Sequence, residues 1–133
     1  MIYEHEIPTG SKLYFGESAK LKRKLENVAS ELFYDAGFEE IVTPFFSYHQ
    51  HQSIDEKELL RFSDEQNHIV SLRADSTMDV VRLSTKRVGR STNHSKWFYI
   101  QPVFRYPSHE VHQIGAELIG EENLGLSIAT SLS

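Results

Sequence analysis

The chain has 133 residues, 39% of them hydrophobic and 25% charged, a composition typical of a globular protein with one core. Its net charge of -5 argues against a broad electrostatic surface for nucleic acid. Cysteine is absent, which excludes disulfides, thiolate nucleophiles and cysteine-based zinc sites. No apolar run approaches the roughly 20 residues of a membrane span, and Met1 to Glu6 lacks a signal-peptide pattern, so we expect a cytoplasmic protein.

A helix is predicted after an extended lead-in over residues 1–16. Ser18 can cap this helix, and Gly37 sits where a left-handed C-terminal cap is expected. Between them, apolar residues recur at three- and four-residue steps, a stripe of helical period that comprises Leu21, Leu25, Val28, Ala29, Leu32, Phe33 and Ala36.

The middle of the chain predicts shorter elements. Residues 38–43 favour a strand that Pro44 closes, because proline cannot donate a ladder hydrogen bond. Residues 49–67 are polar; we expect one or two helical turns over 55–62 and a mobile excursion elsewhere. A strand is expected over 68–73. Asp75 can then cap a second helix that runs to about Lys86 and buries Met78, Val81 and Leu83.

Two strands joined by a short turn at Pro107-Ser108 are predicted over residues 97–106 and 110–119. The second alternates, placing Gln113, Gly115 and Glu117 on one face. Such a polar face is either a solvated outer surface or the wall of a ligand pocket. The tail after Gly120 has helix-like apolar content but is too short for a packed helix. The order of elements predicts a single α+β domain over residues 1–133.

Few residues suggest chemistry by themselves. The seven histidines include the pairs His49/His51 and His109/His112, but exposed loop histidines explain them better than a metal site, so we expect no metal. Arg105 ends an aromatic strand, where a guanidinium could bind a phosphate or a carboxylate. Arg73, Asp75 and Thr77 lie where a strand passes into a helix, a place for ligand contacts, although helix capping alone would explain Asp75 and Thr77.

Four segments, in this order, resemble the catalytic core of class II aminoacyl-tRNA synthetases, most closely the histidyl branch. Residues 37–45 resemble motif 1, which implies a dimer interface that includes Pro44 and Phe45. Residues 103–106 resemble the start of motif 2, with Arg105 at the position that binds the α-phosphate of ATP. Residues 71–77 and 112–120 resemble the segments that hold the histidine substrate. The implied fold is a partial synthetase-like antiparallel sheet flanked by helices.

Departures from the synthetase pattern favour the regulatory branch of this family, whose members assist ATP phosphoribosyltransferase. The residue after Tyr106 is Pro107, where a nearby glutamate should read adenine, and the motif 2 loop holds no cation. Asp75 stands where the synthetases usually have glutamate. We expect motif 3 and the anticodon-binding domain to be absent from this shortened core. A histidyl-tRNA synthetase-like ligase fragment that binds ATP and histidine remains an alternative, and so does an interaction module with an empty pocket.

The regulatory resemblance implies a non-catalytic subunit in the first step of L-histidine biosynthesis. It implies a hetero-oligomer with the catalytic ATP phosphoribosyltransferase subunit, a homodimer, histidine as an effector and no cofactor; tRNA and membrane partners are not expected. The histidine pocket would comprise Asp75, Thr77, Gln113 and Glu117, with Arg105 as a candidate phosphate or carboxylate contact. By strand parity, Arg105 shares a face with Gln113 and Glu117 only if the turn between the two strands has an odd number of residues or a bulge intervenes.

Overall fold

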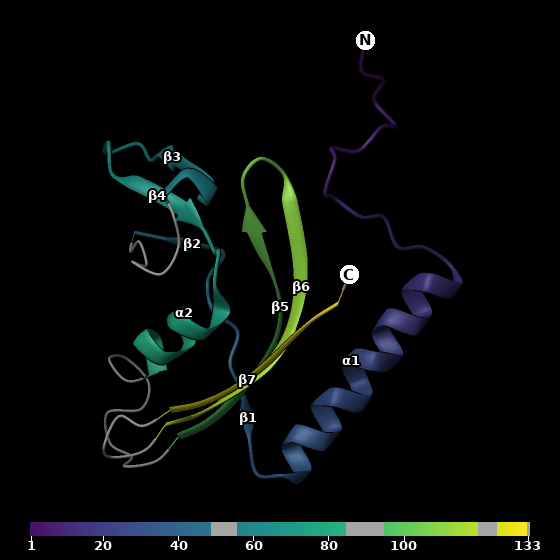
Figure 1. Cartoon of the computed structure of the whole chain (residues 1–133), viewed down its shortest axis with the longest axis vertical. Coiled ribbons are helices and arrows are strands. Elements are labelled where there is room, and N and C mark those ends of the chain that lie inside the picture. Colours follow the sequence, from purple (N-terminus) through teal and green to yellow (C-terminus); the bar gives the residue numbers. More distant parts are fainter. Residues whose placement is uncertain (49–55, 85–94, 120–124, 133) are drawn as a thin grey trace.

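The computed structural model describes residues 1–48, 56–84, 95–119 and 125–132. Its elements are α1 (Glu17–Asp35), β1 (Glu39–Glu40), β2 (Phe46–Ser47), the 3-10 turn η1 (Glu56–Glu58), β3 (Arg61–Ser63), β4 (Ile69–Leu72), α2 (Ser76–Leu83), β5 (Ser95–Arg105), β6 (His109–Ile119) and β7 (Gly125–Leu132). The strands form a four-stranded sheet of order β1-β5-β6-β7 and a three-stranded sheet of order β2-β4-β3 (Figure 1). The α+β prediction is confirmed. Neither described helix is long and apolar enough to cross a membrane.

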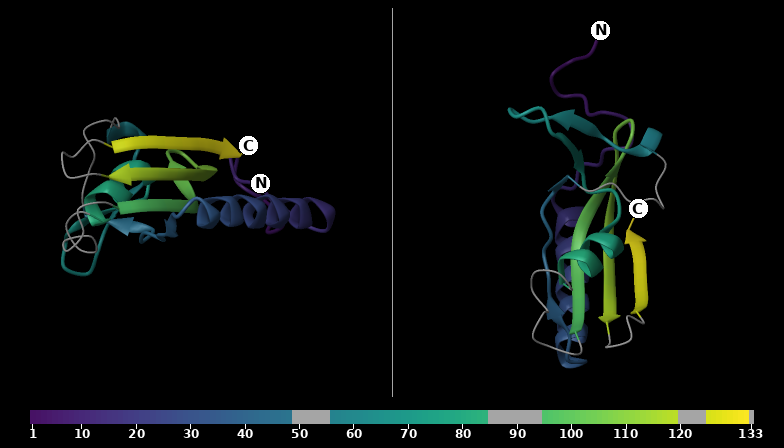
Figure 2. Two further views of the ribbon diagram at one scale, coloured as in Figure 1. Left: turned by 90° about the horizontal axis from the view of Figure 1, so that it is seen from below. Right: turned by 90° about the vertical axis from the view of Figure 1, so that its left-hand side faces the viewer.

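The β5–β6 hairpin is the centre of the molecule. β6 and β7 also pair antiparallel, whereas β1 pairs parallel to β5, so the large sheet is mixed (Figure 2). α1 and α2 lie on opposite sides of the hairpin (Figure 1). The side chains of consecutive β5 residues mark the two faces. Phe98 stacks on Phe33 of α1 with ring centroids 5.1 Å apart, and the hydroxyl of Tyr99 contacts Thr77 of α2.

The C-terminus of α1 forms as its sequence predicts. Gly37 adopts φ 88, and the amides of Gly37 and Phe38 donate to the carbonyls of Tyr34 and Phe33, the two hydrogen bonds of a Schellman motif. The predicted cap at the other end is wrong. The helix begins at Glu17 after Gly16, and the Ser18 hydroxyl instead accepts from the amide of Phe15 at 3.1 Å and donates to its carbonyl at 2.9 Å.

Most of the apolar stripe of α1 does not face the chain's own sheet. Four of its residues remain largely exposed: Leu21 58%, Leu25 46%, Val28 48% and Leu32 65%. The helix contacts the sheet near its C-terminus, where Phe33 of the stripe and the neighbouring Tyr34 pack against Phe98. An amphipathic helix with its apolar face in water presents a surface for another structure to cover.

Several shorter predictions need correction. Only Glu39–Glu40 of the expected strand over 38–43 forms ladder pairs. Residues 56–62, the described part of the predicted helical stretch, hold η1 and the start of β3. β3 pairs with β4 across a turn that contains Asp64 and Asn67 (φ 62). Residues 49–55 of the predicted excursion lie outside the described residues. The C-terminal tail, which has helix-like apolar content but is too short for a packed helix, forms strand β7.

Helix α2 begins as expected but buries other residues. Asp75 is its N-cap, and the Asp75 side chain accepts from the amide of Thr77 at 2.9 Å. Met78, expected in the core, is 41% exposed, and Val80 is fully buried in its place. The buried face of α2 therefore differs from the face that the sequence predicted, and it also includes the polar residues Ser76 and Asp79. Its predicted end at Lys86 lies outside the described residues.

Candidate functional site

The register of the β5–β6 hairpin decides which side chains share a face. Arg105 pairs with His109, Gln101 with Gln113, and Trp97 with Glu117. The turn therefore holds three residues, 106–108, and not the two that the sequence suggested. With this odd number, Arg105, Gln113 and Glu117 lie on one face of the sheet, so the parity condition for a common wall is met.

This polar face is covered by α2 and is not a solvated outer surface at its centre. Tyr99 is fully buried, Gln101 is 4% exposed and Glu117 is 1% exposed. Gln113 is half-buried. A buried carboxylate requires partners, because desolvation of a charge without them costs several kcal/mol. Glu117 therefore lies in a covered polar layer between the sheet and α2, and a solvated outer surface is excluded at this position.

Tyr99 supplies the partner that connects the predicted pocket residues. Its hydroxyl donates to Oε1 of Glu117 at 3.2 Å and lies 3.1 Å from Oγ1 of Thr77. Burial, with the nearby charges of Glu117 and Asp75, raises the pKa of Tyr99 to about 12. The phenol is therefore neutral at neutral pH and has one proton to donate. Since that proton goes to Glu117, the Thr77 hydroxyl is the donor to Tyr99.

Gly115 is the residue that allows the Tyr99 ring to lie on the wall. The two residues are cross-strand partners. A Cβ placed on Gly115 would lie 2.4 Å from the Tyr99 hydroxyl oxygen and 2.5 Å from Cζ, closer than van der Waals contact permits. The glycine that the sequence placed between Gln113 and Glu117 is thus required by a close approach of an aromatic ring.

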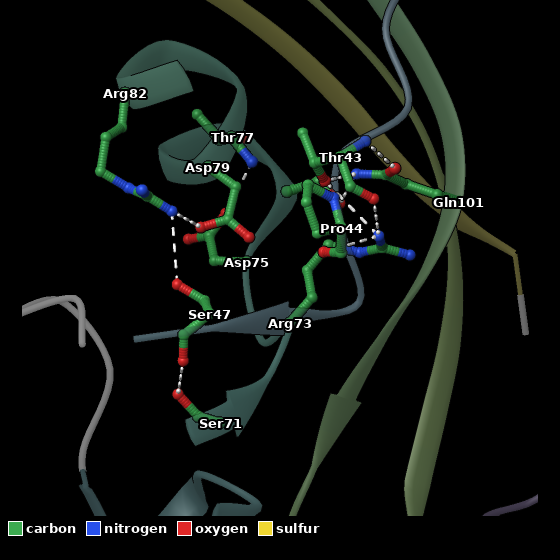
Figure 3. Close-up of polar contacts among 11 residues, drawn as sticks. Thr43, Pro44, Ser47, Ser71, Arg73, Asp75, Thr77, Asp79, Arg82 and Gln101 are labelled. Carbon is green, nitrogen blue, oxygen red and sulfur yellow. Dashed lines mark hydrogen bonds and ion pairs between the residues drawn. The ribbon is translucent and has the colours of Figure 1, made fainter. Parts of the chain in front are cut away.

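Gln101 and Arg73 hold the backbone around this wall (Figure 3). Nε2 of Gln101 donates to Oγ1 of Thr43 and to Oγ of Ser76, each at 3.0 Å. Nε of Arg73 donates to the carbonyl of Pro102, and Nη1 donates to the carbonyl of Thr43, both at 2.8 Å. Arg73 is 1% exposed, and burial lowers its pKa to about 10, so the guanidinium stays charged. Arg73 binds the chain's own carbonyls, which corrects its grouping with ligand contacts.

The predicted pocket residues form two groups. Thr77 and Glu117 meet at the Tyr99 hydroxyl, and Asp75 is close enough to act on the pKa of Tyr99. Asp75 also caps α2, so the capping explanation is correct without excluding a second role. Gln113 lies four residues from Glu117 along β6, roughly 13 Å away at the rise of a strand. It faces Gln101 and stands apart from the first group.

Arg105 lies at the turn end of the same face and already has partners within the chain. Its Nε donates to the carbonyl of Ala74 at 3.1 Å, and its Nη1 forms an ion pair with Glu58 at 3.1 Å. The two side chains are 37% and 54% exposed, so this pair contributes at most about 1 kcal/mol. Arg105 therefore ties η1 to the end of the hairpin, and an anion would have to displace Glu58 to reach its Nη1.

Pro44 and Phe45 lie in the connection between β1 and β2. The Phe45 ring contacts Phe104 and lies under the Arg73 guanidinium, with 4.7 Å between Cζ and the ring centroid. Phe45 nevertheless remains 47% exposed. Their place in a dimer interface stays a prediction.

The histidines give no metal cluster in the part of the chain that the structure describes, where no group of three or more His, Asp or Glu side chains could hold an ion. His109 and His112 are three apart on β6 and therefore point to opposite faces. His112 packs edge-on against Tyr14, and burial lowers its pKa. His49 and His51 lie outside the described residues.

Sequence reasoning missed Tyr99 and Gln101. Both follow Trp97 at two-residue steps, so alternation assigns them to one face of β5. That face coincides with the face of Gln113 and Glu117 only in a known register, and the register depends on the turn length. A three-residue turn at Tyr106-Pro107-Ser108 could not be read from the residues alone.

Comparisons with known proteins show which sequences and structures the chain is similar to. The chain is 62% identical over 122 residues to the ATP phosphoribosyltransferase regulatory subunit of Wolinella succinogenes, covering 91% of this chain and 43% of that one. It is 51% identical to the subunit of the same name from Helicobacter hepaticus, covering 100% and 50%. The chain thus spans about half the length of these curated relatives or less. A solved structure from Bacillus halodurans, described as an ATP phosphoribosyltransferase regulatory subunit/histidyl-tRNA synthetase, superposes with a TM-score of 0.79 at 25% identity, covering 90% of this chain and 34% of that one. The family model for histidyl-tRNA synthetase matches residues 14–129, and the chain therefore belongs to the histidyl-tRNA synthetase family.

Proposed function

We propose that the chain acts as a non-catalytic regulatory subunit of ATP phosphoribosyltransferase in the first step of L-histidine biosynthesis, in the cytoplasm. It would assemble with the catalytic subunit, activate it and take part in feedback by histidine. The 62% and 51% identities to regulatory subunits support this choice within the family. One feature of the hairpin also favours the regulatory role over a catalytic one. The turn 106–108 holds no cation, and Nη1 of Arg105 is paired with Glu58, so neither the turn nor Arg105 offers the free charge that ATP and tRNA chemistry would use.

The effector site would lie along the polar face of the β5–β6 hairpin, the face that carries Gln113 and Glu117. A histidine ammonium needs carboxylate and hydroxyl acceptors, and Asp75, Thr77 and Glu117 are the acceptors that cluster around Tyr99. Gln113, further along β6, would add hydrogen bonds to the polar edge of the ligand. Coupling to the catalytic subunit requires different histidine affinities in two assembly states.

Asp75 allows the capping role and the ligand role to be separated. Asparagine is as good an N-cap as aspartate, so Asp75→Asn should leave the unfolding free energy within about 0.5 kcal/mol of the parent. It removes the charge that the ammonium needs, so histidine affinity measured by calorimetry should fall at least about tenfold. Asp35→Asn, at the exposed end of α1, is the matched control and should bind histidine normally. If neither the chain nor its complex with the catalytic subunit binds histidine, the effector role is wrong.

The ligase alternative predicts a different activity. A synthetase-like fragment would exchange pyrophosphate with ATP in the presence of histidine, and we expect no exchange. Activation of a short-form catalytic subunit on addition of this chain is the positive result for the regulatory role. Exchange without activation would replace the proposal by the ligase alternative.

A further inference from the structure

The small sheet β2-β4-β3 has an aromatic surface that is separate from the polar face of the β5–β6 hairpin. Its register pairs Phe46 with Leu72 and Phe62 with Val70. Because side chains on paired residues share a face, Phe46 and Phe62 both stand over β4. Their rings meet edge to face with centroids 5.6 Å apart. Val70, 7% exposed, forms the floor beneath them.

These rings border a cavity of about 330 Å³, which we call the aromatic trough; its lining is Phe46, Ser47, Tyr48, Phe62, Asp64 and Val70. The rings are open to solvent, with Phe46 58%, Tyr48 71% and Phe62 47% exposed. A trough covered on one side suits a side chain presented by a larger molecule. A free metabolite is usually enclosed over 70–90% of its surface.

Asp64 gives the trough a fixed negative charge. Its Oδ1 accepts from the amides of Gln66 at 2.9 Å and His68 at 2.8 Å, and its Oδ2 accepts from the hydroxyl of Tyr48 at 3.3 Å. These hydrogen bonds, mainly the one from His68, lower the pKa of Asp64. His68 also places Nδ1 3.4 Å from Oδ2, and a protonated imidazole there would offset the carboxylate charge. The carboxylate is therefore charged at neutral pH.

We propose that the aromatic trough is a docking site for a basic side chain, arginine or lysine, of a partner protein. Aromatic ring faces attract a cation and accept its aliphatic stem, and Asp64 supplies a complementary charge. Outer strands β2 and β3 each pair on one side only among the described residues, so a partner segment can lie along the sheet edge while its basic side chain enters the trough.

The test titrates the chain at pH 8 with three blocked tripeptides, acetyl-Gly-Xaa-Gly-amide with Xaa arginine, lysine or leucine. NMR signals of the Phe46, Tyr48 and Phe62 rings report binding. We expect the arginine and lysine peptides to shift these signals and the leucine peptide to bind at least fivefold more weakly. Asp64→Asn keeps the Oδ1 acceptor of the turn but loses the charge, and should weaken arginine binding at least fivefold. Glu65→Gln removes the same charge one residue away, outside the trough lining, and should bind like the parent.

Phe62→Leu is a second variant that keeps an apolar lining but removes a ring face, and it should weaken arginine binding severalfold. Equal binding of the leucine peptide would show a non-selective apolar patch and overturn the proposal. Equal losses in Asp64→Asn and Glu65→Gln, or no ring shifts with any peptide, would overturn it as well. So would a change in the oligomeric state of the chain itself on Phe62→Leu, since the occupant would then be a second copy.

Discussion

The contact between Tyr99 and Gly115 makes the two residues interdependent. Gly115→Ala would drive the Tyr99 ring from its place, since the new Cβ falls 2.4 Å from the hydroxyl oxygen. The bonds from Tyr99 to Glu117 and Thr77 would then break. We expect a loss of about 2–3 kcal/mol in unfolding free energy, measured by urea denaturation. In a Tyr99→Ala background the same substitution should cost under about 1 kcal/mol, and an equal cost in both backgrounds would contradict the ring contact.

Tyr99 also gives the stability of the chain an alkaline dependence. Its pKa is raised from 10.0 to about 12, so the folded state holds the phenol proton where the unfolded state has lost it. The contribution of the neutral Tyr99 phenol to the free energy of unfolding is fully present below pH 10 and is lost as the pH rises from about 10 to 12. Two pKa units correspond to about 2–3 kcal/mol. Relative to the parent, Tyr99→Phe should remove this fall, seen by comparing urea midpoints at pH 9 and pH 11. Tyr106→Phe, at an exposed tyrosine, should leave the fall intact.

Among the elements, Arg73 joins three segments that are distant in sequence. It connects the end of β4 to Thr43 after β1 and to Pro102 in β5. Lysine keeps the charge but cannot reach both carbonyls or lie flat on Phe45. Arg73→Lys should therefore destabilise the fold by about 2–3 kcal/mol in urea unfolding. Arg61→Lys on β3, whose side chain is exposed, is the matched control and should change stability by less than about 0.5 kcal/mol. Equal stability of the two variants would mean that Arg73 is not needed to hold these segments.

The elements also differ in how far the sequence determines them. α1 follows from a helical apolar period and from Gly37, whose left-handed conformation is a local property. β3 and β7 were missed because strands are decided largely by pairing partners elsewhere in the chain. Leu126, Ile128 and Thr130 do alternate within β7, a signal of strand period that composition obscured. For the candidate site, the resemblance supplied Asp75, Thr77, Gln113 and Glu117 as predictions, whereas the places of Tyr99 and Gln101 and the partners of Arg105 depend on the register and on contacts across the fold.

At the scale of the whole molecule, the unusual feature is the outward apolar stripe of α1. Leu21, Leu25, Val28 and Leu32 would remain exposed in an isolated chain. Burying such a stripe between two copies would stabilise a dimer, at about 25 cal/mol per Å² of apolar surface removed from water. We propose that this stripe, with Pro44 and Phe45 nearby in the chain, forms a homodimer interface.

Leu25→Glu tests the interface without entering the core. Because Leu25 is 46% exposed in the single chain, the change should leave helix content by circular dichroism unaltered. A glutamate facing its copy across the dimer would be desolvated and repelled, so sedimentation should show at least a tenfold weaker dimer. Leu13→Glu, at a residue 69% exposed before α1, is the matched control and should dimerise like the parent. A parent chain that sediments as a monomer at all concentrations, or a Leu25→Glu chain that dimerises normally, would show that another structure covers the stripe.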